Sequence, residues 1–160
     1  MSASVGWEKL EIRIADRTIC SALDIEISDT QSGRGHFVAL AGASGIGKTT
    51  LARTLVDRDF QRKVVVNGTV NCSDDLKIAL LPQKPVLAEG ASVQRNLDLF
   101  LRVEQRKSWV DQSRKSSLIS TFGLEELLER TDAKNLSGGE AQRVMLARTL
   151  SLEPDVLILD

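Results

Sequence analysis

The segment 42–49 (GASGIGKT) constrains the fold of this chain more than any other stretch. It fits the pattern G-x-x-x-x-G-K-[ST], with an apolar run at 37–41 before it and an amphipathic run at 50–55 after it. This order predicts a strand, a glycine-rich turn and a helix. The glycines permit backbone angles that other residues disfavour, so successive N–H groups can converge on one anion. The segment therefore predicts a phosphate-binding loop at a helix N-terminus, where the helix dipole also favours an anion.

Two side chains at the end of this loop predict that the anion is a nucleoside triphosphate with its metal ion. We expect Lys48 to reach the β- and γ-phosphates and the Thr49 hydroxyl to bind Mg²⁺. An ordinary glycine-rich turn is the alternative, but a chance match to the whole pattern is expected in roughly one chain of this length in a hundred. The residues expected to contact the nucleotide are Gly42, Ala43, Ser44, Gly45, Ile46, Gly47, Lys48, Thr49 and Thr50.

Composition narrows the remaining possibilities. The 160 residues are 42% hydrophobic and 27% charged, with a formal net charge of -1, which fits one soluble globular domain over 1–160. The near-neutral charge argues against nucleic acid or an anionic membrane as a partner. The N-terminus has no apolar core of the length found in signal peptides. No apolar run reaches the ~20 residues that a membrane helix needs. Cys20 and Cys72 lack clustered ligand partners, so we expect reduced cysteines and no zinc site.

The regions on either side of the loop show strand patterns. Alternation at 10–14 and 23–27 predicts two half-buried strands, joined by a turn at 15–17 into a hairpin. The β-branched stretch 63–72 has Asn-Gly at its centre and predicts a second hairpin. A short strand at 77–81 is ended by Pro82 and Pro85, which leave Gln83 in an exposed, stiff turn.

The period becomes helical from Ser92, a predicted cap, with Val93, Leu97, Phe100 and Leu101 on one face. The stretch 106–117 is charged, with a weaker apolar stripe through Trp109, Val110, Leu118 and Ile119. Its basic residues form either a solvated helix face, which we favour, or a partner-binding patch: Arg106, Lys107, Arg114 and Lys115. Gly123 should end this helix, and 124–130 should form a shorter one with Leu124, Leu127 and Leu128 inward.

A capping box follows at Ser137–Gly138–Gly139–Glu140 and starts a helix that should run to about Ser151, before Pro154. Two glycines in a first turn cost up to ~1 kcal/mol each relative to Ala, so a purely structural cap would not select them. Exposed N–H groups at a helix N-terminus suit a phosphate instead. The final run 155–160 reads as a strand buried on both faces. Asp160 at its C-terminal end is a candidate ligand of Mg²⁺.

These segments together resemble the ATP-binding cassette, the nucleotide-binding domain of ABC ATPases. The loop 42–49 is similar to its Walker A motif and Gln83 to its Q-loop glutamine. The stretch 136–150 (LSGGEAQRVMLARTL) is similar to its signature sequence and following helix, and 156–160 (VLILD) to its Walker B strand. The resemblance implies an α/β fold: a P-loop NTPase (RecA-like) core with an antiparallel β subdomain and an inserted helical subdomain over about 92–135.

The resemblance also implies a mechanism with ATP and Mg²⁺ as cofactors. Lys48, Gln83 and Asp160 would be the catalytic residues, and Thr49, Gln83 and Asp160 would complete the surroundings of Mg²⁺. Ser137, Gly138 and Gly139 would contact ATP bound by a second cassette, arranged head to tail with the first. The implied function is ATP hydrolysis as the nucleotide-binding subunit of a transporter, cytoplasmic and peripheral to the membrane through transmembrane subunits. The surface of 84–88 would receive a coupling segment of such a subunit.

The chain departs from the family pattern in several places. The family has a glutamate directly after Walker B, then a D-loop and a switch histidine, and these fall beyond Asp160. The aromatic residue that stacks on adenine would fall near Ile14 or Ala15, so we consider weak stacking or recruitment of Trp7. The family's sheet also has a strand between Walker B and the P-loop strand. We therefore expect an incomplete sheet and the N-terminal portion of a longer cassette.

Two other function classes remain as alternatives. A non-transporter ABC ATPase of the translation-factor type would carry a second Walker A motif beyond Asp160. The second alternative is a module that binds ATP without hydrolysing it. Loss of the glutamate that positions the attacking water would have this result, because it slows hydrolysis more than it weakens ATP binding.

Overall fold

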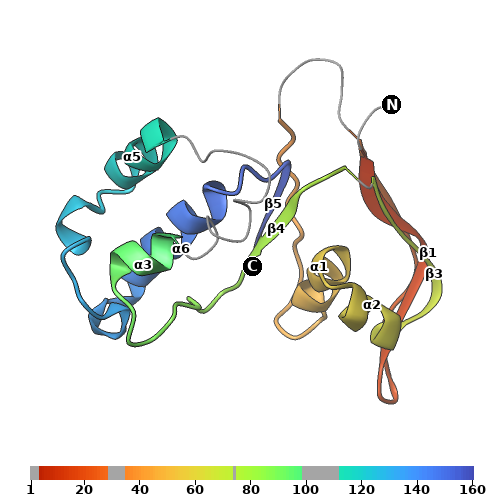
Figure 1. The fold of residues 1–160 in the computed structure, drawn as a ribbon. Coiled ribbons are helices and arrows are strands. Elements are labelled where there is room, and N and C mark those ends of the chain that lie inside the picture. The colour runs from red at the N-terminus through yellow and green to blue at the C-terminus, as the bar shows by residue number, and fades with distance from the viewer. Residues whose placement is uncertain (1–3, 29–34, 74, 99–111) are drawn as a thin grey trace. The chain divides into compact units, whose positions relative to one another are not determined.

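The computed structural model describes residues 4–28, 35–73, 75–98 and 112–160 and divides into two compact units. The first unit is Met1–Leu80 together with Asp160, and the second is Leu81–Leu159. The chain contains helices and strands in both halves, coloured by residue number in Figure 1.

An antiparallel sheet of three strands forms one part of the first unit. The strands are β1 (Ser4–Ile14), β2 (Arg17–Ser28) and β3 (Val65–Cys72), in the order β2-β1-β3. Ile14 pairs with Arg17 across a two-residue turn, which confirms the first predicted hairpin. Both strands extend beyond the alternating stretches from which they were predicted, because pairing continues to Ser4 and Ser28.

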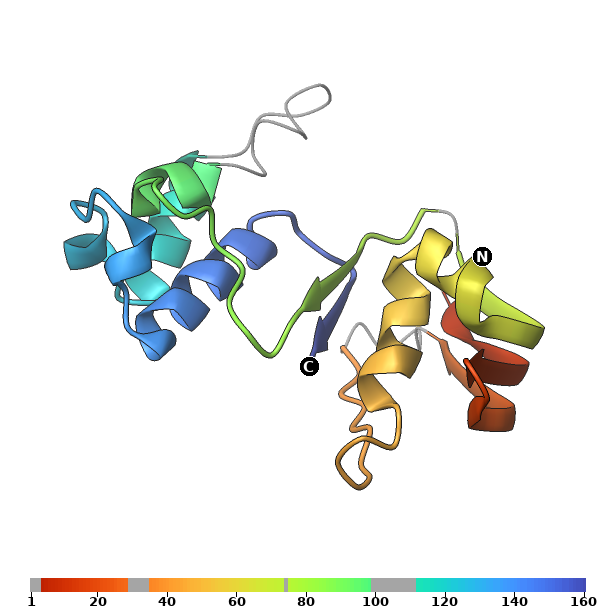
Figure 2. The same cartoon turned by 90° about the horizontal axis from the view of Figure 1, so that it is seen from below.

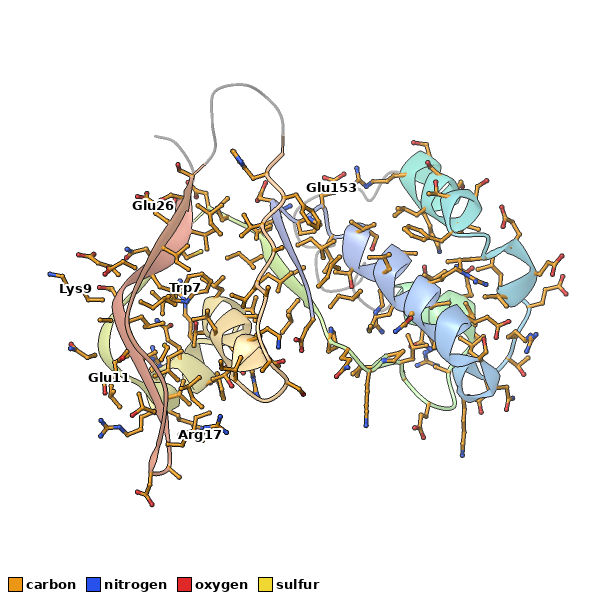
Figure 3. The ribbon with its side chains drawn as sticks, turned by 180° about the vertical axis from the view of Figure 1, so that it is seen from behind. Trp7, Lys9, Glu11, Arg17, Glu26 and Glu153 are labelled. Carbon is orange, nitrogen blue, oxygen red and sulfur yellow. The ribbon has the colours of Figure 1, made fainter. Side chains whose placement is uncertain are left out.

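Two helices, α1 (Lys48–Val56) and α2 (Arg58–Val64), pack against this sheet and form its core. Leu10 and Ile12 are 0% exposed, and burying each such side chain contributes about 1.5–3 kcal/mol. Trp7 points from β1 toward α1, whereas Lys9 points to the opposite side (Figure 3). The Trp7 indole N–H donates to Thr54 Oγ1 at 3.0 Å, so this large side chain is buried with its polar atom satisfied.

The predicted hairpin at 63–72 is wrong. Residues 65–72 form the single strand β3, and Lys63 and Val64 belong to α2. Gly68 has φ +80, but it lies at an irregularity in the pairing of β3 with β1, where a Cβ would come within 2.3 Å of the Lys9 carbonyl oxygen. The Asn-Gly pair therefore marks a bulge in the pairing of β3 with β1 and not the turn of a hairpin.

Helix α2 was not predicted. Asp57 is its N-cap, since its carboxylate accepts the Phe60 N–H at 2.8 Å and also pairs with Arg53 of α1 at 2.8 Å. These interactions hold the pKa of Asp57 below its ordinary value, with the Phe60 hydrogen bond as the largest cause. An Asp between two helices is a recognisable cap, and this signal was available in the sequence.

The predicted strand at 37–41 is also wrong. Residues 35–43 carry no helix or strand, and Phe37 is 94% exposed. A strand requires a hydrogen-bonded neighbour, and none pairs with this run in the described part of the chain. The following turn and helix α1 are confirmed.

The strands at 77–81 and 155–160 are confirmed as β4 (Ile78–Leu81) and β5 (Val156–Leu159), which pair with each other in a separate two-stranded sheet. Strand β5 was predicted to be buried on both faces, and this prediction is wrong. Its first three residues are half-buried and Leu159 is 63% exposed, because a sheet of two strands covers little of either face.

Besides β5, the second unit contains α3 (Val93–Asp98) and α5 (Gln112–Thr121), which both contact α6 (Gly138–Leu150) (Figure 2). Two 3-10 turns, Glu125–Leu127 and Ala133–Asn135, connect α5 to α6. The core of this unit comprises Val93, Leu97, Leu124, Leu127, Val144 and Ala147.

Several helical predictions are confirmed. The Ser92 hydroxyl accepts the Arg95 N–H at 3.1 Å, and Gly123 follows the end of α5 with φ +59. Leu124 and Leu127 are buried, but their segment forms a 3-10 turn rather than an α-helix. The predictions for Phe100, Leu101, Arg106, Lys107, Trp109 and Val110 lie outside the described residues.

Two residues of the predicted basic stretch interact with acids of their own unit. Arg114 pairs with Glu153 at 2.9 Å, and Lys115 pairs with Asp98 of α3. These contacts favour a structural role over a partner-binding patch for this pair. Among the helices described, none combines the length and apolar character needed to cross a membrane.

Candidate functional site

The loop 42–47 leads into α1 with a backbone that requires glycine at two positions. Gly45 has φ +75 and Gly47 has φ +113, a region that L side chains rarely adopt. Gly47 is also the N-cap of α1, and a Cβ there would lie 2.2 Å from Ile19 Cγ2 of β2. Helix α1 therefore begins without a side-chain cap, and its first-turn N–H groups have no acceptor within the helix.

Lys48 lies folded over the same loop. Its Nζ donates to the Gly42 carbonyl at 2.8 Å and to the Ala43 carbonyl at 2.9 Å. Both acceptors are in exposed backbone, so the ammonium is held close to the loop without being buried. Because these bonds are made to neutral oxygens, a phosphate would be a stronger partner for the same ammonium group.

The structure brings the other end of the described chain to this loop. The Thr49 hydroxyl donates to Asp160 Oδ1 at 2.7 Å, across 111 positions of sequence. Asp160 directly follows β5 and belongs to the same compact unit as the loop. A hydroxyl and a carboxylate in contact offer two hard oxygen ligands, which is the donor chemistry that Mg²⁺ prefers. The residues present thus fit a magnesium ion.

Arg17 is a further residue at the loop that the sequence did not reveal. Its Nη2 donates to the Gly45 carbonyl at 3.1 Å, from the first position of β2 (Figure 3). The sequence placed Arg17 only in a turn, and no local pattern links it to the loop. Its guanidinium adds a second positive charge, beside that of Lys48, at this glycine-rich loop.

The structure does not support recruitment of Trp7 for adenine stacking. Trp7 is 8% exposed and hydrogen-bonded to Thr54. Bringing it to the loop would remove it from the core between β1 and α1. Ile14, near the position where the family carries an aromatic residue, is 40% exposed.

The remaining predicted site residues lie in the second unit. Gln83 is exposed in a bend just after β4, between Pro82 and Pro85, as predicted for a stiff turn. Ser137 is the N-cap of α6, and Gly138 and Gly139 form its first turn. The structure therefore joins Lys48, Thr49 and Asp160 in one unit, and places Gln83 and the start of α6 in the other.

The capping box at the start of α6 is confirmed. The Ser137 N–H donates to Glu140 Oε2 at 2.7 Å, and the Glu140 N–H donates to Ser137 Oγ at 3.3 Å. The first of these bonds is the main reason that the pKa of Glu140 lies below its ordinary value of 4.5. The ionised Glu140 therefore stabilises the folded state at pH values above the ordinary pKa of the group. This stabilisation is lost as the pH falls through the lowered pKa of Glu140 in the folded state.

The two glycines of α6 have no structural requirement that the described part of the chain reveals. Neither has a positive φ, and a Cβ on Gly138 or Gly139 would meet nothing within 4 Å. Both are exposed. This differs from the loop at 42–47, where the backbone itself requires glycine.

Comparison with known proteins identifies the family of the chain. The family model described as ABC transporter matches residues 26–160. "Aliphatic sulfonates import ATP-binding protein SsuB 2" of Pseudomonas syringae pv. syringae (strain B728a) is 41% identical over 160 residues, 100% of this chain and 54% of that protein. "Sulfate/thiosulfate import ATP-binding protein CysA" of Synechocystis sp. (strain ATCC 27184 / PCC 6803 / Kazusa) is 31% identical over 92% of this chain and 41% of its own length.

Solved structures share the fold. The structure of cbiO1 from Clostridium perfringens, titled part of the ABC transporter complex cbiONQ, has a TM-score of 0.72 at 24% identity, over 100% of this chain and 66% of that one. A bacterial Atm1-family ABC exporter with ATP bound has a TM-score of 0.76 at 24% identity, over 100% of this chain and 29% of that one. The chain spans about half the length of the curated relatives. By its motifs, fold and family match, the chain belongs to the ABC transporter family, as a nucleotide-binding domain with a P-loop NTPase fold.

Proposed function

We propose that this chain binds ATP with Mg²⁺ at the loop 42–50 and acts in ATP hydrolysis as the nucleotide-binding part of an ABC transporter. The observation that carries the proposal is the Thr49–Asp160 hydrogen bond beside Lys48. It gathers an ammonium, a hydroxyl and a carboxylate at a helix N-terminus, which are the groups that a metal-bound triphosphate requires.

The loop would bind the triphosphate through backbone and side-chain donors. Lys48 would exchange its two loop carbonyls for phosphate oxygens, and the free N–H groups at the start of α1 would donate to the same anion. Arg17 lies close enough to the loop, through Gly45, to add charge stabilisation. Nucleotide binding would therefore replace bonds within the loop rather than require a new loop conformation.

Thr49 and Asp160 would hold Mg²⁺, with Gln83 as a further oxygen ligand. The ion would neutralise charge on the β- and γ-phosphates during phosphoryl transfer. Thr49 and Asp160 would each direct one oxygen at the ion and would thereby help to position the phosphates. Their present hydrogen bond supports this role, because it shows that the two side chains reach one another.

Ser137, Gly138 and Gly139 would contact ATP bound by a second copy or a related cassette, head to tail. This proposed contact is supported by the backbone angles and surroundings of the two glycines. Among the described residues, neither sterics nor φ requires glycine at position 138 or 139. Side chains at these positions would keep a phosphate away from the helix N–H groups. A shared site of this kind would link ATP binding to closure of the dimer.

A role in transport would place the chain on the cytoplasmic face of the membrane, bound to transmembrane subunits. The relatives' names refer to import of sulfonates and sulfate, which favours an importer. The segment at 84–88, in which Lys84 is exposed and Val86 is 63% exposed, is the surface proposed for the membrane partner.

Titration with a fluorescent ATP analogue and Mg²⁺ tests the nucleotide site. We expect Lys48→Ala to weaken binding at least about tenfold, since it removes a charged donor worth more than ~1.4 kcal/mol. Phosphate release, measured in parallel, tests turnover.

The matched control is Lys63→Ala, which removes an exposed lysine from the last turn of α2 in the same unit. We expect its affinity to match the unaltered chain. Equal affinity of the Lys48 and Lys63 variants would contradict the proposed site, and tight binding without phosphate release would favour an ATP-binding module.

A further inference from the structure

The start of β2 holds both left-handed glycines of the loop at 42–47 from outside the loop. Arg17, the first residue of β2, donates from Nη2 to the Gly45 carbonyl at 3.1 Å. Ile19 lies so close to Gly47 that a Cβ on this glycine would be 2.2 Å from the Ile19 Cγ2. The loop is therefore fixed at two points by a strand that is distant from it in sequence.

The hydrogen bond from Arg17 sets the orientation of the peptide unit that joins Gly45 to Ile46. In a trans peptide the carbonyl and the following N–H point in opposite directions, so a carbonyl held by Arg17 turns the Ile46 N–H away from Arg17. That N–H donates across the loop to the Ala43 carbonyl at 3.4 Å. Gly45 has φ +75, and glycine also permits other angles, so without Arg17 this peptide unit can flip at little conformational cost.

The orientation of this peptide unit matters most when an anion is bound. Lys48 holds the loop through the Gly42 and Ala43 carbonyls, and a bound triphosphate would draw its ammonium group away from both. The bond from Arg17 to Gly45 would remain. A flipped peptide unit would direct the Gly45 carbonyl oxygen into the loop, where an N–H attracts a phosphate and a carbonyl oxygen repels it.

We propose that Arg17 is a positioning residue, which holds the Gly45 carbonyl outward so that the loop presents an N–H to the phosphates at this peptide unit. This rests on the proposed function, in which the loop at 42–50 binds a nucleoside triphosphate. The effect passes through a neutral backbone oxygen of the chain itself. It therefore persists in high salt, which screens any direct attraction between the exposed guanidinium and the phosphates.

Relaxation-dispersion NMR of the ¹⁵N-labelled chain without nucleotide tests the peptide unit itself. We expect one sharp signal for the Ile46 amide in the unaltered chain. Arg17→Met keeps a long side chain but removes its donors, so the amides of Ile46 and Gly47 should show exchange broadening on the microsecond-to-millisecond timescale. Arg17→Lys retains a donor and should restore most of the sharpness. Melting curves verify that each variant folds.

Titration of the same variants with Mg²⁺ and the fluorescent ATP analogue tests the consequence for binding. Arg17→Met should weaken binding about fivefold, the expected effect of one lost hydrogen bond. Most of this loss should remain at about 0.5 M NaCl. The matched control is Arg13→Met, which removes an exposed arginine from β1 of the same hairpin and should change neither the affinity nor the Ile46 signal.

Sharp signals for Ile46 and Gly47 in a folded Arg17→Met variant would overturn the proposal, and so would a broadened Ile46 signal in the unaltered chain. A loss of affinity confined to low salt would also overturn it, in favour of a direct charge effect. If the unaltered chain does not bind the analogue, the proposed function fails, while the NMR signals without nucleotide still decide whether Arg17 positions the peptide unit.

Discussion

Two helices in this chain begin with glycines, and they do so in different ways. Helix α1 follows Gly45 and Gly47, both with positive φ, and has no side-chain cap. Helix α6 begins at Gly138 and Gly139 with ordinary backbone angles, and it has a complete capping box from Ser137 and Glu140. The N-terminus of α1 therefore lacks a side-chain cap and follows glycines in the left-handed region. The N-terminus of α6 is capped by Ser137 and Glu140, and its glycines have ordinary backbone angles.

The difference shows where the reason for each glycine lies. At Gly47 a Cβ would collide with Ile19 of β2, so the fold of this unit itself requires glycine. At Gly139 a Cβ would meet nothing in the described residues, and helix propensity favours alanine. The requirement at α6 would then come from something that binds there, which is how a head-to-tail nucleotide site would act.

The largest expected effect is that of Gly47→Ala. The new Cβ would lie 2.2 Å from Ile19 Cγ2 at φ +113. Strain and overpacking together should lower the free energy of unfolding by about 3 kcal/mol. Urea denaturation measures this value, and a titration with the fluorescent ATP analogue should show loss of binding.

Gly45→Ala is the matched control for that prediction. Its φ is +75, but a Cβ there would meet nothing within 4 Å, so it should cost only about 1 kcal/mol. Equal losses for the two variants would show that the close approach of Ile19 does not matter.

The sequence predicted these helix starts well because the motif that marks each of them lies within a few residues, although the close approach of Ile19 to Gly47 could not be read from it. The capping box of Ser137 and Glu140 follows from a spacing of three, and the turn before α1 from its glycines. The strand at 37–41 and the hairpin at 63–72 were wrong because pairing depends on distant segments. The bulge at Gly68 exists only because β1 lies beside it.

The candidate site divides in the same manner. Lys48 and Thr49 could be assigned from the loop pattern, and Asp160 from its place after a strand and the family resemblance. The contact of Arg17 with Gly45 spans 28 positions. No local pattern connects such a pair, so only the folded chain reveals it.

A smaller effect is expected from Ser137→Ala. This change removes the hydroxyl that accepts the Glu140 N–H and should lower the free energy of unfolding by about 1 kcal/mol. Urea denaturation again measures it. Ser137→Asn, which retains a side-chain cap, should recover most of the loss, whereas equal losses for Ala and Asn would contradict the capping role.

The smallest expected effect on stability, and the sharpest test of the comparison, is that of Gly139→Ala. Alanine is the better helix former and meets no atom here, so the free energy of unfolding should rise by about 0.5 kcal/mol. If these glycines serve a second cassette, the same variant should weaken self-association in Mg²⁺ and ATP, measured by analytical ultracentrifugation. A loss of stability would show that Gly139 serves its own fold. Unchanged association would contradict a role of Gly139 in a second cassette's site, because no described residue of the chain lies close enough to require glycine there.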